Sequence, residues 1–513
     1  MIDRFIKLIL ILLFVVTPMG MGSTELWAFS TMELGILLLI ILWAVQNIKK
    51  QQTMMASGQQ FRVPMVLLSV FLCLVLFQML NLPSKAIEII SPMTFEVRHQ
   101  LQLTNDPLPM ISLSFFPHAT KTEFFKWITL AGFFLFLLHW KPLDNEYRIL
   151  TQLMLVILMV GFIESLYGIG EVFGAKTGAS TGMGTFVNRN HFAGYLLMVI
   201  PLSIGFLFSR EANQTRRFRS WVQHLSSLDG RGILIGFAVI VMILGLIFSA
   251  SRMGISSLLL SFTFMTIFVR NPGGERTFSK KSILILGLAL VWAAWIGLDA
   301  VISRFFTSSE DFGKRWEIWE GTLQIIKDFP LFGSGLGTFD QIFPMHSSLH
   351  VRGLVTHAEN DFLQLASEVG LIGFGLLLAL FVFLFFKVAS GLRKLSQGEP
   401  RRYIGMGALV GILALMFHSL VERNIQVPAN SFLYTFLWVV VLQTTRTRDP
   451  LRSLSPAKRN ETGSPQRHTR LPAGREGTEE SFCLVCPENF SGQTKNLSPS
   501  GHSFLSSRYL PTG

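Results

Sequence analysis

Twelve apolar segments recur along this chain, most of them close to the length at which an α-helix crosses a lipid bilayer. A helix needs about 20 apolar residues for this purpose. The segments span residues 5–21, 27–46, 63–81, 123–140, 150–170, 190–209, 232–250, 253–269, 282–301, 367–387, 403–421 and 430–445. They predict an all-α fold, a polytopic integral membrane bundle of about 12 transmembrane helices.

The composition agrees with a membrane protein. Half of the 513 residues are hydrophobic and 15% are charged, whereas soluble domains carry about 25% charged residues. These values argue against a cytoplasmic enzyme, a disordered protein and a secreted module held by disulfides. The formal net charge of +12 would suggest nucleic acid in a soluble chain, so the positions of the basic residues matter.

Most of the basic residues that precede the tail fall in alternate connections between the apolar segments, as at Arg216–Arg219 and Lys280–Lys281. Positively charged connections stay in the cytoplasm. This rule predicts that both termini are cytoplasmic, and it explains the basic residues without a nucleic-acid partner.

Three regions are expected. Residues 1–149 hold the N-terminal transmembrane helices, residues 150–445 form a transmembrane core, and residues 446–513 are predicted to be a disordered cytoplasmic tail. The core contains a large outer loop at 302–366, between the ninth and tenth helices. A connection of this length is uncommon unless it is functional.

The first apolar segment and the cysteines leave alternatives open. Arg4 and Lys7 precede an apolar core as in a signal peptide, but no A-x-A site follows, which favours a retained helix. Cys73 lies in an apolar segment and is expected to be a small buried hydrophobe. Cys483 and Cys486 form a lone C-x-x-C, which is weak support for zinc.

Five separate stretches bring polar groups to the outer ends of the predicted helices. They contain Asn188, Arg189, Asn190 and His191; Ser249, Ser251 and Arg252; Lys314 and Arg315; His357, Asn360 and Asp361; and His418, Glu422 and Arg423. Ionisable groups at the membrane are costly and usually functional. The stretches therefore predict one polar site at the outer face.

The stretch that begins at His357 has a helical spacing of polar residues. In a helix, the five residues His357, Asn360, Asp361, Gln364 and Glu368 would share one face. That face is a polar contact between helices or a catalytic or binding surface centred on His357. Histidine is the side chain most able to exchange a proton near neutral pH.

The segment from Arg315 spaces Trp316 and Trp319 as a helix would, which predicts an interfacial amphipathic helix ending near Phe329–Pro330. The glycine-rich turn GSGLG at 333–337 follows it. Such a turn either supplies flexibility or presents backbone N–H groups to an anion.

Arg189, Arg252 and Arg315 are considered together, because arginine suits the bidentate recognition of phosphate oxygens. Arg252 occupies a tight outer turn, against the positive-inside trend. The three predict an anionic substrate presented from the membrane, such as a lipid diphosphate. The sequence has no D-x-D, Walker A or H-E-x-x-H motif, so no metal or cofactor is predicted.

At these same residues the chain resembles the O-antigen ligase and O-antigen polymerase superfamily. The matching stretches are GTFVNRNHFAGYLLMVIPL (184–202), SASRMGISSLLL (249–260), RWEIWEGTLQIIKDFPLFGSGLGTF (315–339), HAENDFLQLASEVGLIGFGLLL (357–378) and HSLVERNIQVPAN (418–430). The resemblance implies a metal-independent, inverting glycosyltransferase of the GT-C type in the bacterial inner membrane. The implied donor is a glycan on undecaprenyl diphosphate, and the implied acceptor is a sugar hydroxyl of lipid A-core, of another repeat unit or of a protein.

The resemblance also implies roles for particular residues. His357 matches the essential histidine of the family, which would activate or orient the acceptor hydroxyl. Arg252 and Arg315 match arginines that hold the diphosphate, and Arg189 lies at a more variable position of the same kind. Supporting polar groups are implied at Asn188, Asn190, Asn360, Asp361 and Glu422. Where many relatives carry Asp followed by Phe, this chain has Glu422 and Arg423.

Two questions stay open at this point. Ligase and polymerase motifs overlap, so the sequence does not separate ligation from chain extension. A transporter or flippase of a lipid-linked glycan is the alternative function. It would distribute polar groups across both leaflets, whereas here they collect at one face.

Overall fold

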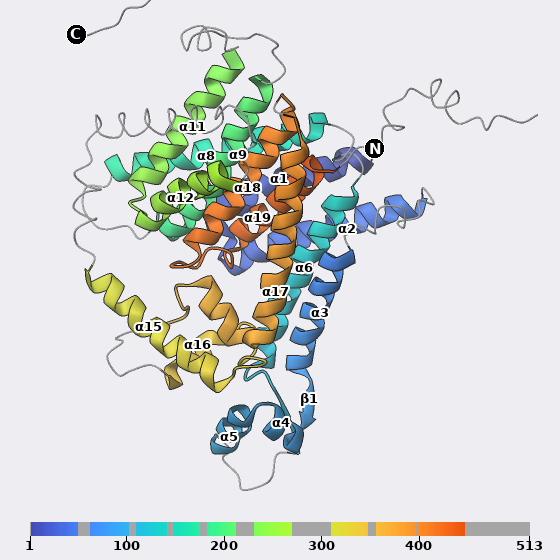
Figure 1. Cartoon of the computed structure of the whole chain (residues 1–513), viewed down its shortest axis with the longest axis vertical. Helices are drawn as coiled ribbons and strands as arrows, with labels where there is room; N and C mark the ends of the chain where they lie inside the picture. Colours follow the sequence, from blue (N-terminus) through green and yellow to red (C-terminus); the bar gives the residue numbers. More distant parts are fainter. Residues whose placement is uncertain are drawn as a thin grey trace, which may run out of the picture. The chain divides into compact units, whose positions relative to one another are not determined.

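The computed structural model describes residues 2–49, 62–101, 109–140, 143, 147–174, 182–211, 230–268, 309–346, 355–396 and 398–446. Its longer helices are α1 (Ile2–Met19), α2 (Leu26–Lys49), α3 (Arg62–Met79), α6 (Pro117–His139), α8 (Tyr147–Gly174), α9 (Arg189–Glu211), α11 (Gly230–Phe248), α12 (Arg252–Phe268), α15 (Ser309–Asp328), α17 (Asp361–Lys394), α18 (Pro400–His418) and α19 (Pro428–Thr444). The fold of this part of the chain is a helix bundle (Figure 1).

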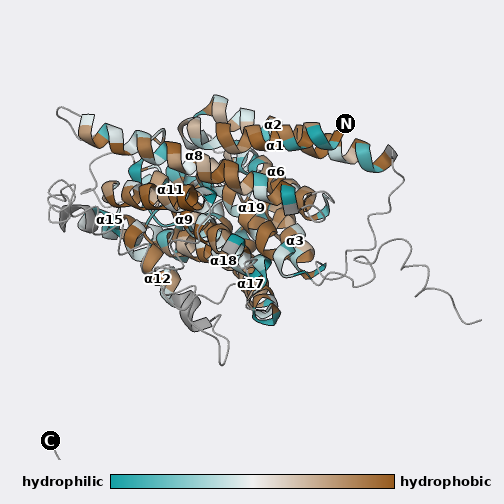
Figure 2. Cartoon of the chain, turned by 90° about the horizontal axis from the view of Figure 1, so that it is seen from above, coloured by the Kyte–Doolittle hydropathy of each residue, from teal (hydrophilic) through white to brown (hydrophobic). Residues whose placement is uncertain are grey.

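The helices confirm the predicted fold class in its coarse form, a multi-pass helical membrane protein. Within the described residues, eight helices are long and apolar enough to cross a membrane: α2, α3, α6, α8, α9, α11, α17 and α18. Figure 2 shows that hydrophobic residues dominate these helices. Helices α1, α12 and α19 also match predicted segments, and their crossing of the membrane stays a prediction. The segment 282–301 and the tail 446–513 fall, apart from Arg446, outside the described residues.

Helices α9 and α18 pack closely because glycines line their contact. A Cβ atom on Gly205 would lie 2.4 Å from the carbonyl oxygen of Tyr403, and one on Gly407 would lie 2.4 Å from that of Pro201. Small residues let helix backbones approach one another inside a membrane. The contact sets the start of α9 beside the end of α18, where the polar stretches meet.

Helix α1 is part of the same core. The ring of Phe14 lies 5.0 Å from that of Phe432 and 4.8 Å from that of Phe436, both on α19. These edge and tilted ring contacts are favourable geometries for aromatic pairs. The first apolar segment thus packs as a helix of the bundle, and its retention stays a prediction.

Small elements gather at one end of α3, α6 and α17 (Figure 1). They are β1 (Asn81–Pro83), α4 (Ser84–Ile90), α5 (Pro92–Gln100), β2 (Met110–Ser112), α16 (Phe339–Ile342) and the 3₁₀ turn η4 (Phe343–Met345). The two strands pair antiparallel, with Asn81 opposite Ser112. The rings of Phe329, Phe339 and Phe343 form a separate apolar cluster beneath α15. Part of the predicted outer loop 302–366 is therefore ordered helix.

Helix α17 is interrupted at Gly370, whose φ of 67° is left-handed. The segment after α15 lies against this break and exchanges backbone hydrogen bonds with it. Ser334 N–H donates to the carbonyl of Ser367 over 3.0 Å, and Leu371 N–H donates to the carbonyl of Pro330 over 2.8 Å. This contact fixes the segment after α15 to the N-terminal part of α17.

One prediction about the apolar segments is wrong. Cys73 was expected to be buried, but the structure exposes it on α3. An apolar segment in a membrane bundle does not have to be buried by protein, since lipid accepts apolar side chains equally well. Cys483 and Cys486 lie outside the described residues.

Candidate functional site

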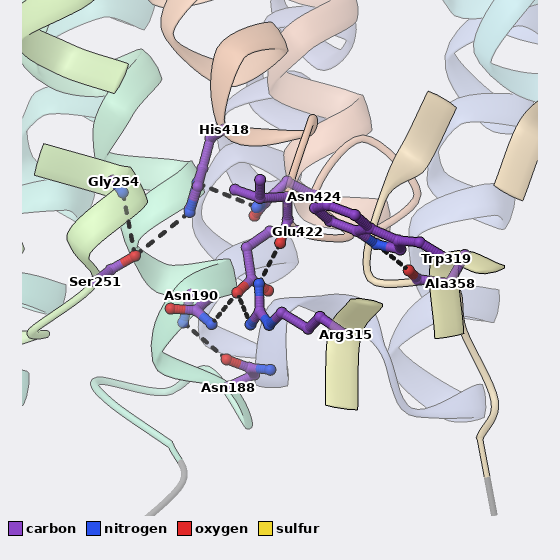
Figure 3. A network of polar contacts seen from close by, with 11 residues as sticks. Asn188, Asn190, Ser251, Gly254, Arg315, Trp319, Ala358, His418, Glu422 and Asn424 are labelled. Carbon is purple, nitrogen blue, oxygen red and sulfur yellow. Dashed lines mark hydrogen bonds and ion pairs between the residues drawn. The ribbon is translucent and has the colours of Figure 1, made fainter. Parts of the chain in front are cut away.

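The loop between α18 and α19, residues 419–427, connects most of the predicted site residues. The carboxylate of Glu422 is ion-paired with the guanidinium of Arg315 from α15, and Arg315 also donates to the carbonyl oxygen of Val421. Asn190 Nδ2, at the start of α9, donates to the same carboxylate oxygen over 2.6 Å. Figure 3 shows this network of three segments.

Asn188 prepares the start of α9 for this contact. Its Oδ1 accepts a hydrogen bond from the backbone N–H of Asn190 over 2.8 Å. Side-chain oxygens at this position satisfy the free N–H groups of a helix start. Arg189 is the first residue of α9 and is partly buried. Arg189, one of the three arginines predicted to bind an anion, therefore directly precedes the residue that contacts Glu422.

The start of α17 is tied to the same loop by two residues. Asn360 Oδ1 accepts hydrogen bonds from Phe362 N–H and Leu363 N–H, while its Nδ2 donates to the Leu420 carbonyl over 2.7 Å. Asp361 Oδ2 accepts from the N–H groups of Asn424 and Ile425 over 2.8 and 2.7 Å. These bonds fix the loop against the segment that carries His357.

His357 lies in non-helical backbone just before α17, so the prediction that it sits on a helical stripe is wrong. The helix starts at Asp361, because Asn360 serves as its N-cap. Trp319 Nε1 on α15 donates to the carbonyl of Ala358 over 3.1 Å and so orients this segment.

The partner of the His357 imidazole comes from the loop between α18 and α19. The guanidinium of Arg423 contacts Nε2 of His357. Burial, followed by the charges of Arg423, His191 and Lys126, lowers the pKa of His357 from 6.5 to about 3. The imidazole is therefore neutral at physiological pH.

Two further groups of the loop have shifted pKa values. Burial raises the pKa of Glu422 to about 7, and the charge of Arg315 acts in the opposite direction. Burial lowers the pKa of Arg423, against the attraction of nearby carboxylates. In both cases removal from water disfavours the charged form.

Arg252 follows a tight turn between α11 and α12. Ala250 in this turn has a φ of 51°, and the hydroxyl of Ser251 lies 3.4 Å from Nε2 of His418. Asn424 Nδ2 lies 3.1 Å from Nδ1 of His418. Because an amide nitrogen only donates, Nδ1 accepts and the ring proton of the neutral imidazole is on Nε2. Arg252 is the first residue of α12, next to this chain of contacts.

The glycine-rich turn at 333–337 does not present its N–H groups to solvent. The N–H of Gly335 donates to the Glu368 carbonyl over 2.9 Å, and that of Gly337 donates to the Glu368 carboxylate over 2.9 Å. Leu336 N–H donates to Oε1 of Gln78 over 3.2 Å. The turn thus holds α17 and α3 together and is not arranged as an anion cradle.

A cavity of about 250 Å³ lies between α3, α6, α17, α18 and α19. Glu123, Lys126, Asp361 and Glu368 line it together with a larger set of apolar side chains. The charges of Lys126 and Glu123 act on His357 and Arg423, respectively. Two charged side chains that line this mainly apolar cavity therefore influence the pKa values of His357 and Arg423.

The structure brings together residues from each of the five predicted stretches, with Arg315, Glu422 and Asn190 in direct contact. Sequence reasoning missed the contact of Arg423 with His357 and the role of Trp319. The adjacent charges at 422 and 423 were visible in the sequence as a departure from relatives, but their partners were not. Among the described residues, no group of three or more His, Cys, Asp or Glu is placed to hold a metal ion.

The comparison with protein families matches a part of the chain that contains several of the predicted site residues. Residues 237–378 match the family model described as O-antigen ligase. The matched range runs from α11 into α17 and contains Arg252, Arg315, His357, Asn360 and Asp361. No curated protein matches the chain. The match shows that this part of a multi-pass membrane protein is similar to O-antigen ligases, which supports the resemblance to that superfamily.

Proposed function

We propose that this protein is a membrane glycosyltransferase that moves a glycan from undecaprenyl diphosphate to a sugar hydroxyl at the periplasmic face. The observation that carries the proposal is the gathering of Arg315, Arg423, His357 and Glu422 around one loop. Guanidinium groups suit a diphosphate, and a neutral imidazole suits a hydroxyl proton. The O-antigen ligase domain supports the same reaction class.

The donor half of the proposed reaction uses the arginines. Negative charge grows on the diphosphate as the bond between it and the anomeric carbon breaks. Arg252 and Arg315 hold this charge, and Arg189 assists from the start of α9. Donors fixed in advance stabilise such a transition state without reorganisation, and the loss of one donor costs about 10²–10³-fold in rate.

The acceptor half uses His357. The acceptor hydroxyl oxygen attacks the anomeric carbon from the side opposite the diphosphate, and its proton passes to Nε2 of the imidazole. The configuration at the anomeric carbon is inverted in this single displacement. A base contributes about 10²–10⁴-fold, and a neutral imidazole can accept the proton. Asn188, Asn190, Asn360, Asp361 and Glu422 hold these groups in place.

The apolar cavity supports a lipid-linked substrate. Leu68, Phe381 and Trp438 are among the side chains that line it, and Asp361 and Glu368 belong to the same lining. Apolar walls with a few polar groups are typical of ligand pockets. We assign the protein to the bacterial inner membrane with both termini in the cytoplasm and the site on the outer side. The acceptor is lipid A-core in ligation, or another repeat unit in polymerisation.

A transfer assay with the purified full chain tests the proposal. Lipid-linked oligosaccharide is the donor, and lipid A-core and repeat-unit glycans are the alternative acceptors. We expect covalent transfer to one acceptor class, unaffected by chelators. His357→Ala should lower the rate at least 10²-fold. His118→Ala, a matched change at an exposed residue near the start of α6, should leave it unchanged.

Three results would contradict the proposal. Full activity of His357→Ala would remove the imidazole from the reaction. Loss of activity with a chelator, restored by magnesium, would contradict the metal-free mechanism. Movement of the lipid-linked glycan across proteoliposomes without any covalent transfer would favour the transporter alternative.

A further inference from the structure

Arg423, which stands where many relatives carry Phe, contacts the histidine proposed as the general base. Its side chain crosses from the α18–α19 loop to the segment before α17, and its guanidinium contacts Nε2 of His357. Arginine is a donor only and has no acceptor atom. Nε2 must therefore accept, which puts the ring proton of a neutral imidazole on Nδ1. The atom that a general base would use is already engaged.

The backbone around Arg423 fixes this arrangement. On one side, Glu422 is held by Arg315 and Asn190. On the other side, the N–H of Asn424 is held by Asp361. With both neighbours anchored, the backbone of Arg423 has little freedom, but its long side chain has rotatable bonds. The side chain, and not the loop, is the part able to change partners.

An anion is the ligand that would draw this side chain away. A diphosphate offers arginine several anionic oxygens in a geometry that suits two parallel hydrogen bonds, whereas the imidazole offers a single neutral acceptor atom. The Nε atom of Arg423 is buried and has no hydrogen-bond partner among the described residues. The guanidinium therefore keeps unused donor capacity next to the proposed diphosphate site.

We propose that Arg423 is an additional diphosphate-binding residue, which contacts Nε2 of His357 before the donor binds and moves to the diphosphate of the donor when it arrives. This inference rests on the proposed function. Its consequence is an order of events: the donor must arrive before the imidazole is free to take the acceptor proton. Water or an acceptor that arrives before the donor meets an imidazole whose accepting atom is covered.

The surrounding charges are consistent with a guanidinium that can move. Arg423 faces four carboxylates, Asp361, Glu123, Glu359 and Glu368. His357 faces the positive charges of Arg423 and Lys126 and the imidazole of His191. When a diphosphate neutralises Arg423, one cause of the lowered pKa of His357 disappears. The pKa of the imidazole then rises toward neutrality, where a general base works best.

Binding of farnesyl diphosphate to the purified full chain tests the inference without any transfer. Isothermal titration calorimetry should show an affinity about 10- to 100-fold weaker for Arg423→Gln than for wild type. Arg423→Lys keeps the charge but loses the bidentate geometry, so its affinity should lie between those of wild type and Arg423→Gln. Arg401→Gln is the matched control, because Arg401 pairs with Glu399 outside the site, and its affinity should equal that of wild type.

A double-mutant cycle separates this role from a structural one. His357→Ala removes the resting partner of Arg423, so it should tighten farnesyl diphosphate binding by about 3- to 10-fold. In the Arg423→Gln background the same change should have no effect. A structural role for Arg423 would not make the removal of His357 favourable. Weaker binding after His357→Ala in both backgrounds would overturn the inference.

The pH profile gives a second readout. Loss of the Arg423 charge raises the pKa of His357, so the acidic limb of kcat/KM should move to higher pH in Arg423→Gln. An unchanged limb together with wild-type affinity for farnesyl diphosphate would also overturn the inference. Failure of the proposed function is a distinct result, because the wild-type protein would then transfer no glycan from any lipid-linked donor. If Arg423→Gln does not fold, Arg423→Lys decides by the affinity for farnesyl diphosphate and by the double-mutant cycle, because it keeps the charge and should leave the acidic limb in place.

Discussion

The guanidinium of Arg315 and the carboxylate of Glu422 form an ion pair between two segments that are 107 residues apart in the sequence. Arg315 lies inside the matched O-antigen ligase range and Glu422 lies outside it. The side chain of Glu422 is only 4% exposed and that of Arg315 is 26% exposed. The pair therefore joins α15 to the α18–α19 loop in a partly dry setting. It fixes the guanidinium that we propose binds the diphosphate.

Removal of the Glu422 carboxylate should both destabilise the protein and misplace Arg315. Breaking a buried pair leaves an uncompensated charge, so Glu422→Ala should lower the free energy of unfolding by about 2–4 kcal/mol. Glu422→Gln keeps a hydrogen-bond acceptor and should cost less. Thermal unfolding in one detergent gives the ranking. Glu399→Gln breaks the pair with Arg401 and should cost under about 1 kcal/mol. Equal costs at 422 and 399 would refute the argument.

Substitutions at Asn360 should separate its two hydrogen-bonding roles. Asn360→Asp keeps the acceptor that caps α17 but loses the donor to the Leu420 carbonyl. Asn360→Ala loses both, and the loss of the cap alone costs about 1 kcal/mol. We expect thermal stability to fall in the order Asn, Asp, Ala. Transfer activity should fall in the same order, because the cap positions the segment that carries His357. The reverse order of Asp and Ala would contradict this assignment.

Two glycines of α17 should respond to alanine in opposite ways. At Gly370 an added Cβ would lie 2.3 Å from the Leu331 carbonyl oxygen, and the φ of +67° is strained for alanine. At Gly375 nothing lies within 4 Å. Gly370→Ala should therefore destabilise by about 3 kcal/mol or more, while Gly375→Ala should stabilise by up to about 1 kcal/mol. Thermal unfolding checks both, and a tolerated Gly370→Ala would show that the break in α17 is not required.

The sequence predicted the helices well because one physical variable, apolar length, decides which segments enter a membrane. It did not predict where α17 starts. A spacing of polar residues shows a shared face only if the whole segment is helical. Asn360 is the N-cap at which α17 begins, so His357 lies before the helix. The preference of asparagine for N-caps was the signal that could have corrected this.

The partners of the site residues were harder to predict than their identity. The residues that meet at Glu422 come from α9, α15 and the α18–α19 loop, and no local pattern encodes such a meeting. The glycine-rich turn shows the same limit. Its N–H groups are taken up by Glu368 and Gln78, two residues on different helices, so its role became clear only from tertiary contacts.

Trp319 should matter for activity through its ring nitrogen, whereas its neighbour Trp316 should not. Trp319 Nε1 donates to the Ala358 carbonyl beside His357, while Trp316 is 54% exposed. Trp319→Phe keeps an aromatic ring and removes the donor, so the transfer rate should drop about 10-fold through misplacement of the imidazole. Trp316→Phe should change it less than about 2-fold. Equal effects in the transfer assay would leave Trp319 no role in positioning His357.

The pKa of His357 predicts how stability depends on pH. The folded protein lowers this pKa from 6.5 to about 3, so the unfolded chain takes up the proton first as the pH falls. The stability contributed by the neutral imidazole is fully present above pH 6.5 and is lost as the pH falls from about 6.5 toward 3. His357→Gln lacks a titrating group there and should lose less stability over this window. Thermal unfolding of both proteins between pH 7.5 and pH 4 measures the difference. Parallel curves would mean that the imidazole is not held neutral by burial and Arg423.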